Sequence, residues 1–393
     1  MKNILLCDAN FCVLPILQSI MSKGHHLSVA GSFLSDPAHQ IADKSVPINY
    51  ADIDTLYKNI IENKYEHIVP GCNDRSYLSL AQIAERLNYR GFDKYETVLT
   101  IHHKDKFRAF AESHNYPVPK AVNDFSRIDS LKFPIIIKPV DSFSGKGTSK
   151  VENIQDVQKY WNEAKEFSIT GSVVAEEFVE GKLYSHSAFI KNKKIVVDFF
   201  VNEYCTIYSY QVNSSNIATQ LSQKVQQGLR KWTEQFAQDL DLVDGLVHTQ
   251  FISDNETFSL IEIARRCPGD LYSQLIQKST GVNYAELYSL PFIGEELPDK
   301  VEKEEKYFSR HTVSVDKECI FISSGVNLAS KNIQNVQLKY SGQKMKPAPF
   351  DKSGIYFIEH DSVQEMEEKT KKLKDYIILE TLDIPLKDNN AKL

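Results

Sequence analysis

Residues 133–147 bring two lysines and several small residues together at the end of an apolar segment. The stretch reads Phe-Pro-Ile-Ile-Ile-Lys-Pro-Val-Asp-Ser-Phe-Ser-Gly-Lys-Gly, so an apolar strand delivers Lys138 and continues into a short loop. Small residues let backbone N–H groups approach a polyphosphate, and lysines supply the countercharge. The stretch therefore predicts a phosphate-binding loop, although the chain has no G-x-x-x-x-G-K-[ST] and no G-x-G-x-x-G after its first strand. The loop residues with this role are Ser142, Ser144, Gly145, Lys146 and Gly147.

Lys138 itself follows three isoleucines in the predicted strand. An unpaired ammonium in such apolar surroundings would be costly, so Lys138 needs an anion nearby. A ligand phosphate is one candidate, and a neighbouring carboxylate such as Glu176 is the other. The residues alone leave both partners open.

Two oxygen-bearing side chains lie on adjacent strands of a predicted hairpin. Runs 246–252 and 258–263 flank the turn Asp-Asn-Glu, which places Gln250 and Glu262 on neighbouring antiparallel strands. Cross-strand Cβ atoms lie roughly 5 Å apart, and Mg²⁺ prefers oxygen ligands. The hairpin therefore predicts a magnesium site. An ion pair of Glu262 with Arg265 or Arg266 is the alternative.

Further charged residues follow the ends of predicted strands. A guanidinium binds carboxylate or phosphate in a bidentate way, so Arg266 is a candidate anion-binding residue, while Arg265 is either a substrate contact or a structural partner. Asp270, in the turn Cys-Pro-Gly-Asp, is a candidate amine-binding carboxylate. Asn73 and Asp74 follow the third strand, where open α/β sheets bind ligands, and a helix N-cap is the equal alternative.

The elements that position these residues change character along the chain. The first hundred residues alternate strands and helices, which predicts a parallel sheet covered on both faces. A helix over 104–114 then precedes a strand-rich block and a long helix over 217–240. A mixed α/β segment follows residue 300, with a charged helix near 362–372. The N-terminal strands are expected at 3–7, 27–30 and 67–70, with helices at 15–23, 53–63 and 77–87.

Bulk composition narrows the class of protein. The chain has 393 residues, of which 42% are hydrophobic and 25% charged, as in a globular protein of two or three domains. A net charge of -6 argues against general nucleic-acid binding. No apolar run is long enough to span a membrane, and the N-terminal strand is too short for a signal sequence. The six cysteines form no C-x-x-C, so reduced thiols and a cytoplasmic location are expected.

Four motifs occur in a fixed order behind the α/β segment. They are Lys104-Asp-Lys-Phe-Arg before Tyr-Pro-Val-Pro, then Lys138-Pro with its loop, then the acidic strand end 174–181, and finally the hairpin with Glu-Ile-Ala-Arg-Arg. This order resembles the ATP-grasp superfamily of carboxylate–amine and carboxylate–thiol ligases, over roughly residues 1–300.

The resemblance implies an α/β ATP-grasp fold with an N-terminal parallel α/β (pre-ATP-grasp) domain, a small lid and a larger antiparallel-sheet domain. The expected divisions are residues 1–100 for the N-terminal domain, 101–182 for the linker helix and lid, 183–300 for the metal-binding subdomain, and 301–393 for a C-terminal extension. ATP and Mg²⁺ are the implied cofactors, and a homodimer is common among such relatives.

The resemblance also assigns site residues. Arg266 and Lys138 are the implied catalytic residues, and Gln250 and Glu262 the metal ligands. Three positions differ from the usual family pattern: Gln250 stands where a glutamate is usual, and Leu183 where a ribose-binding glutamate is usual. Ala264 stands where an asparagine is often found, as in some branches such as the aminoimidazole ribonucleotide carboxylases. The implied nucleotide contacts are Lys104, Lys138, Ser142, Ser144, Gly145, Lys146, Gly147, Glu176, Glu177, Phe178 and Val179.

The implied reaction activates a small-molecule carboxylate as an acyl phosphate, which an amine then displaces, with release of ADP and phosphate. Amino acids or peptides are the expected substrates. Two alternatives stay open: a carboxylase that works through carboxyphosphate, and a nucleotide-binding protein whose catalysis has decayed. The latter is motivated by Gln250 and Leu183.

Overall fold

The computed structural model describes residues 1–142 and 145–384. The described chain forms two compact units. The first unit contains residues 1–142, 147–202 and 218–305, and the second contains residues 145–146, 203–217 and 306–384. Within the described ranges, no helix has the length and apolar character that crossing a bilayer requires.

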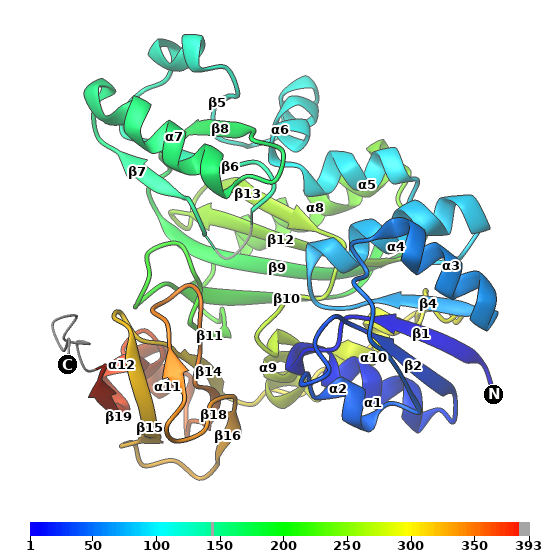
Figure 1. Cartoon of the computed structure of the whole chain (residues 1–393). Helices are drawn as coiled ribbons and strands as arrows, with labels where there is room; N and C mark the ends of the chain where they lie inside the picture. The colour runs from blue at the N-terminus through cyan, green and yellow to red at the C-terminus, as the bar shows by residue number, and fades with distance from the viewer. Residues whose placement is uncertain (143–144, 385–393) are drawn as a thin grey trace, which may run out of the picture. The chain divides into compact units, whose positions relative to one another are not determined.

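The first unit begins with a four-stranded parallel sheet in the order β3-β2-β1-β4 (Figure 1). Consecutive residues Ile4, Leu5 and Leu6 of the central strand are all fully buried, so both faces of the sheet are covered. The strands are β1 (Asn3–Cys7), β2 (His26–Ala30), β3 (Lys44–Val46) and β4 (His67–Pro70), with helices η1 (Phe11–Val13), α1 (Leu14–Ser22), α2 (Ala38–Ile41), α3 (Ile53–Asn63) and α4 (Asp74–Leu87).

A small antiparallel sheet follows, in the order β5-β8-β6-β7. Alternate residues Ile135, Ile137, Val173 and Ala175 pack into a core with Val157 and Ala164 of the covering helix α7. The intervening residues therefore face the other side of this sheet. The elements are α5 (Tyr95–His102), α6 (Lys104–Ser113), β5 (Ala121–Val122), η2 (Phe125–Ser130), β6 (Ile135–Pro139), β7 (Ser149–Val151), η3 (Ile154–Asp156), α7 (Val157–Phe167) and β8 (Val173–Glu177).

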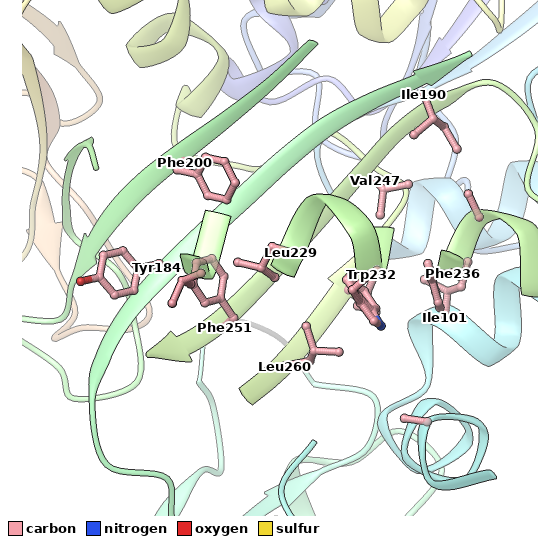
Figure 2. Close-up of a cluster of buried hydrophobic side chains, with 14 of the residues drawn as sticks. Ile101, Tyr184, Ile190, Phe200, Leu229, Trp232, Phe236, Val247, Phe251 and Leu260 are labelled. Atoms are coloured by element: carbon pink, nitrogen blue, oxygen red, sulfur yellow. The ribbon is translucent and has the colours of Figure 1, made fainter. Parts of the chain in front are cut away.

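The larger antiparallel sheet of the first unit has the strand order β13-β12-β9-β10. Helix α8 buries Val225, Leu229, Trp232 and Phe236, which recur every three or four residues and so share one helical face. Figure 2 shows this face packed against strand residues such as Val247 and Leu260. The elements are β9 (Lys182–Lys191), β10 (Lys194–Tyr204), α8 (Gln223–Asp239), β12 (Gly245–Ser253), β13 (Phe258–Ala264), α9 (Tyr272–Thr280) and α10 (Tyr284–Ser289).

The second unit contains further strands and has its own small cores. Strands β11, β14, β18 and β16 are neighbours in that order, and β17, β15 and β19 form a three-stranded antiparallel sheet. The elements are β11 (Ser214–Ile217), β14 (Phe308–Val313), β15 (Cys319–Val326), β16 (Ile333–Gln337), β17 (Lys344–Met345), β18 (Gly354–Glu359), α11 (Val363–Thr370), α12 (Leu373–Tyr376) and β19 (Ile377–Asp383).

The α/β fold class with its parallel and antiparallel sheets is confirmed, and the starts of two helices were wrong. The helix expected over 77–87 begins at Asp74, because Asn73 is its N-cap. The helix expected over 217–240 begins at Gln223, because Ile217 ends β11 and the Ser222 hydroxyl accepts the Val225 N–H as the N-cap. The division into four domains stays a prediction.

Candidate active site

Lys138 and Glu176 form a buried ion pair on the face of the small sheet opposite helix α7. The Lys138 Nζ lies 2.8 Å from Glu176 Oε2, and Arg108 Nε of α6 lies 2.8 Å from Glu176 Oε1. All three side chains are less than a tenth exposed. The carboxylate alternative for Lys138 is therefore what the structure shows. Two cations share one anion, which leaves a net positive charge at the site.

The pKa values of this cluster follow from its burial and its charges. Burial lowers the pKa of Lys138 to about 8, and nearby Arg108 and Lys104 add to the effect while Glu176 opposes it. Burial would raise the pKa of Glu176, but Arg108 and Lys138 outweigh it and lower the pKa to about 2. Glu176 is thus ionised at neutral pH, and Lys138 titrates in the alkaline range.

Lys104 connects the small sheet with the larger one. It is the first residue of α6, and its Nζ donates to the Ser142 carbonyl over 3.0 Å. The same Nζ lies 3.7 Å from Glu262 Oε1. The Lys104 ammonium therefore lies between the start of the phosphate-loop segment and the hairpin that carries the expected metal ligands.

Gln250 and Glu262 lie directly opposite each other on β12 and β13, as the hairpin spacing predicts. Across the sheet, Gln250 also pairs with Ser185 of β9. Among the described residues, no group of three His, Cys, Asp or Glu side chains could hold a metal. One carboxylate and one amide oxygen fit a cation that takes its remaining oxygens from a phosphate and water.

Arg266 makes a bidentate ion pair with Asp74 at the N-terminus of α4. Its Nε donates to Asp74 Oδ1 over 3.3 Å and its Nη2 to Oδ2 over 3.1 Å. His102 Nδ1 lies 2.9 Å from the same Oδ1. Burial would raise the pKa of Asp74, but Arg266 and His102 outweigh it and hold the pKa well below its usual range. Asp74 is therefore a carboxylate that faces a guanidinium.

Arg265 has different surroundings. Its Nε lies 2.8 Å from Asp93 Oδ2, and the side chain is 1% exposed. The remaining guanidinium groups donate to the carbonyls of Leu246 and Val243 over 2.7 Å each. These contacts are those of a structural arginine, whereas the side chain of its neighbour Arg266 stays 17% exposed.

Asn73 and Asp270 lie close to the Arg266 segment in the fold. Asn73 caps α4 by accepting the Ser76 N–H over 2.9 Å, and its Nδ2 donates to Asp8 Oδ2 over 2.8 Å. The N-cap alternative for Asn73 is thus present in the structure. Asp270 has a left-handed backbone, and its N–H donates to Cys12 Sγ over 3.1 Å.

Two backbone N–H groups at the acidic end of β8 already donate hydrogen bonds within the protein. The N–H of Glu177 donates to the Lys120 carbonyl and that of Phe178 to the Pro134 carbonyl, each over 3.0 Å. Base recognition by this segment would therefore fall to Val179 N–H and to carbonyl oxygens. Lys150 lies 4.3 Å from the centre of the Phe178 ring.

The loop residues divide between the two units. Ser142 and Gly147 belong to the first unit, and Gly147 has a φ of +72° with a would-be Cβ 2.8 Å from Phe167 Cβ, so only glycine fits. Gly145 and Lys146 belong to the second, where Lys146 Nζ lies 5.2 Å from the centre of the Phe350 ring. Ser144 lies outside the described residues.

Sequence reasoning missed three residues of this site. Arg108 was within the quoted Lys104 motif, and its spacing of one helical turn from Lys104 could have signalled a shared face. His102 carries no local signal. His248 lies two residues before Gln250 on β12, and its Nδ1 is hydrogen-bonded to Ser187 Oγ at 2.7 Å. Burial, with nearby Arg266, lowers the pKa of His248 to about 3.

Comparisons with known proteins find a family model and several relatives that match part of the chain. The model of a family described as "ATP-grasp domain" matches residues 101–270. A formate-dependent phosphoribosylglycinamide formyltransferase of Pseudomonas fluorescens is 30% identical over 190 residues, which are 45% of this chain and 47% of that protein. The same enzyme of Methanocaldococcus jannaschii is 29% identical over 152 residues, 36% of this chain and 39% of that protein. The chain thus spans less than half the length of these relatives.

Solved structures share the fold along nearly the whole chain. An L-amino acid ligase from Bacillus licheniformis has a TM-score of 0.80 at 17% identity and covers 97% of this chain and 98% of its own. A phosphoribosylglycinamide synthetase from Anaerococcus prevotii has a TM-score of 0.75 at 16% identity, with 96% and 99% covered. Residues 101–270 therefore match the ATP-grasp domain model, and the chain shares the fold of these solved structures along nearly its whole length.

Proposed function

We propose that this protein is an ATP-dependent, ADP-forming carboxylate–amine ligase. The observation that carries the proposal is the convergence of Lys104, Lys138 and Glu262 within an ATP-grasp domain. A substrate carboxylate attacks the γ-phosphorus of ATP, and ADP leaves. The resulting acyl phosphate is attacked by an amine, so the C–O bond to phosphate breaks as the C–N bond forms and the amine loses its proton.

ATP binding would use the positive charge of the Lys138 cluster. Lys138 and Lys104 face the phosphates, and Val179 with its neighbours contacts the base. Gln250 and Glu262 would hold Mg²⁺, which when bound neutralises charge on the phosphates. The lysines act by position and charge, and no protein group becomes covalently modified.

Arg266 is the proposed anion-binding residue at the reacting end. Its guanidinium suits the carboxylate, the acyl phosphate or both in turn. Asp270 remains the candidate for the incoming amine, because a carboxylate attracts an ammonium. The names of the relatives, a formate-dependent formyltransferase and an L-amino acid ligase, support a small carboxylate and an amine as substrates. Amino acids or peptides are the substrates we propose to test first. A homodimer and a cytoplasmic location stay predictions.

The test is a phosphate-release screen with ATP, Mg²⁺ and pairs of amino acids. We expect release of ADP and phosphate with a cognate pair, and loss of at least about 100-fold in the Lys138→Ala variant because a phosphate countercharge is gone. Glu176 keeps Arg108 as a partner in this variant, so the fold should survive, which circular dichroism would check. Lys159→Ala, an exposed lysine on α7, is the matched control.

Two results would reject this assignment. Unchanged phosphate release by Lys138→Ala would show that the cluster does not serve ATP. Release that requires bicarbonate, and no other carboxylate, would move the protein to the carboxylase alternative.

A further inference from the structure

Two adjacent arginines at the end of β13 are each held by an aspartate from the N-terminal hundred residues. Arg265 is paired with Asp93 and Arg266 with Asp74. The two pairs differ in what remains of each guanidinium. Arg265 spends its remaining N–H groups on backbone carbonyls and is 1% exposed, whereas the Arg266 side chain is 17% exposed. The guanidinium of Arg265 is thus buried and fully hydrogen-bonded, and we call this the closed pair. Part of the Arg266 side chain stays exposed.

The Asp74 contact is side-on. Arg266 donates to Asp74 from Nε and Nη2, and within the described part of the chain its guanidinium makes these two hydrogen bonds. The opposite edge, formed by Nη1 and Nη2, is geometrically suited to a second bidentate anion. Glu262 is close enough to act on Arg266 electrostatically, so this cation lies beside the expected metal ligand.

His102 fixes the orientation of Asp74. Its Nε2 accepts the backbone N–H of Arg265 over 3.4 Å, and an amide can only donate. The ring proton must therefore be on Nδ1, where it is donated to Asp74 Oδ1 at 2.9 Å. The ring is completely buried and stacks on Tyr77 with centroids 5.0 Å apart. The same imidazole thus accepts a hydrogen bond from the Arg265 backbone and donates one to the Asp74 carboxylate that is paired with Arg266.

We propose that Asp74 and His102 are positioning residues that set the Arg266 guanidinium for the anionic reacting group. Asp74 then has a different role from the direct substrate contact expected from its place after β4. The inference rests on the proposed function, because it assigns the reacting end of the same site. On this proposal the N-terminal parallel-sheet region influences kcat, whereas binding of the ATP phosphates depends on Lys104 and Lys138.

Four variants separate positioning from general stability. In Asp74→Asn the charge that holds Arg266 is lost, and we expect kcat to fall on the order of 100-fold while the Kd for ATP changes less than about twofold. His102→Leu should resemble it. His102→Asn keeps an N–H donor near the Nδ1 position and should recover most of kcat. Asp93→Asn, which breaks the closed pair, should lower the melting temperature but leave kcat of the folded fraction unchanged.

A spectroscopic readout makes the test independent of turnover. Arginine labelled with ¹⁵N gives an Nε–H signal for each guanidinium, and the signal that disappears in Arg266→Lys identifies Arg266. We expect a slowly exchanging Arg266 Nε–H in the native protein, lost in Asp74→Asn and His102→Leu, and retained in His102→Asn and Asp93→Asn.

The proposed function and the positioning role of Asp74 and His102 can be rejected separately. A native protein that turns over no substrate would remove the proposed function, while the Nε–H signal would still decide whether Asp74 holds Arg266. An Arg266 signal and a kcat that are unchanged in Asp74→Asn would overturn the positioning role. So would an equal loss of kcat in Asp93→Asn, since the effect would then be one of stability.

Discussion

At the scale of single residues, the site is built from charges that lie too deep to be left unpaired. Glu176 partners both Lys138 and Arg108, and Asp74 partners both Arg266 and His102. Each carboxylate therefore stabilises the charged form of a cationic side chain in poorly solvated surroundings. Such cations bind an incoming anion without first being dehydrated, which is the electrostatic advantage of a prepared site.

The depressed pKa of Lys138 has a consequence for nucleotide binding. Bound phosphate favours the ammonium form, so affinity requires the protonated lysine. With a pKa of about 8 in the free protein, the ammonium is fully present below that pH and is lost above it. We expect the Kd for ATP to be nearly constant from about pH 6.5 to 7.5 and to rise by up to roughly tenfold per unit above pH 8.

Calorimetric titration of a non-hydrolysable ATP analogue across this range measures the effect. Lys138→Gln is the matched control, which should bind weakly but with a flat pH dependence. A native-like alkaline slope in that variant would show that another group titrates.

At the scale of elements, helix α6 supports the charged cluster formed by Lys138, Glu176 and Arg108. It carries Lys104 and Arg108 on the site side, and its Phe107 packs edge-on to Phe236 of α8 with centroids 6.3 Å apart. Phe236 also stacks on Trp232 at 5.1 Å. The aromatic cluster in Figure 2 thus couples α8, the larger sheet and the helix that delivers two of the site cations.

Removing the ring of Phe236 should therefore affect both stability and the site. Phe236 is fully buried, so Phe236→Ala is expected to lower the free energy of unfolding by about 3–5 kcal/mol. ATP affinity should fall as well, because α6 loses a packing partner. Urea unfolding followed by tryptophan fluorescence measures the first effect, and calorimetry the second.

Gln238→Ala, an exposed residue on the same helix, is the control and should change neither quantity. A loss below about 1 kcal/mol for Phe236→Ala would mean that the cluster is not a cooperative part of the core.

At the scale of the whole molecule, each unit buries a neutral histidine. Burial lowers the pKa of His248 in the first unit and of His311 in the second to about 3 each. His248 is hydrogen-bonded to Ser187, and His311 Nδ1 to Ser214 Oγ at 2.6 Å. Each unit therefore has an imidazole that takes up a proton in mildly acidic solution only after the unit unfolds.

Acid should destabilise both units for this reason. The unfolded chain binds protons at these histidines below about pH 6.5 whereas the folded chain does so only near pH 3, so stability falls as the pH drops through that window. Each histidine contributes a slope of up to about 1.4 kcal/mol per pH unit. Thermal melts from pH 7 to pH 4 measure the slope.

His248→Gln and His311→Gln should each flatten the acid limb, the first through the unit that holds the site and the second through the other unit. His26→Gln, whose side chain is 42% exposed, should not. Equal acid slopes in all variants would place the acid sensitivity elsewhere.

The amino-acid sequence by itself determined most helices and strands of the first unit and the cross-strand pairing of Gln250 with Glu262. Alternation along the β12–β13 hairpin already set Gln250 opposite Glu262, because strand periodicity is local, whereas the three consecutive isoleucines before Lys138 do not alternate. The order of the motifs was enough to indicate the ATP-grasp fold, which the family match and the shared folds agree with.

Only the tertiary structure decided which charges meet. Glu176 lies 38 residues from Lys138, and Asp74 lies 192 residues from Arg266, so neither pair could be chosen over its rivals from local pattern. Arg265 and Arg266 are adjacent and identical in type, yet Arg265 is bonded to Asp93 and two carbonyls, whereas Arg266 is paired with Asp74 and stays partly exposed. Ion pairs depend on distance in space and on burial, and both arise only when the helices and sheets pack.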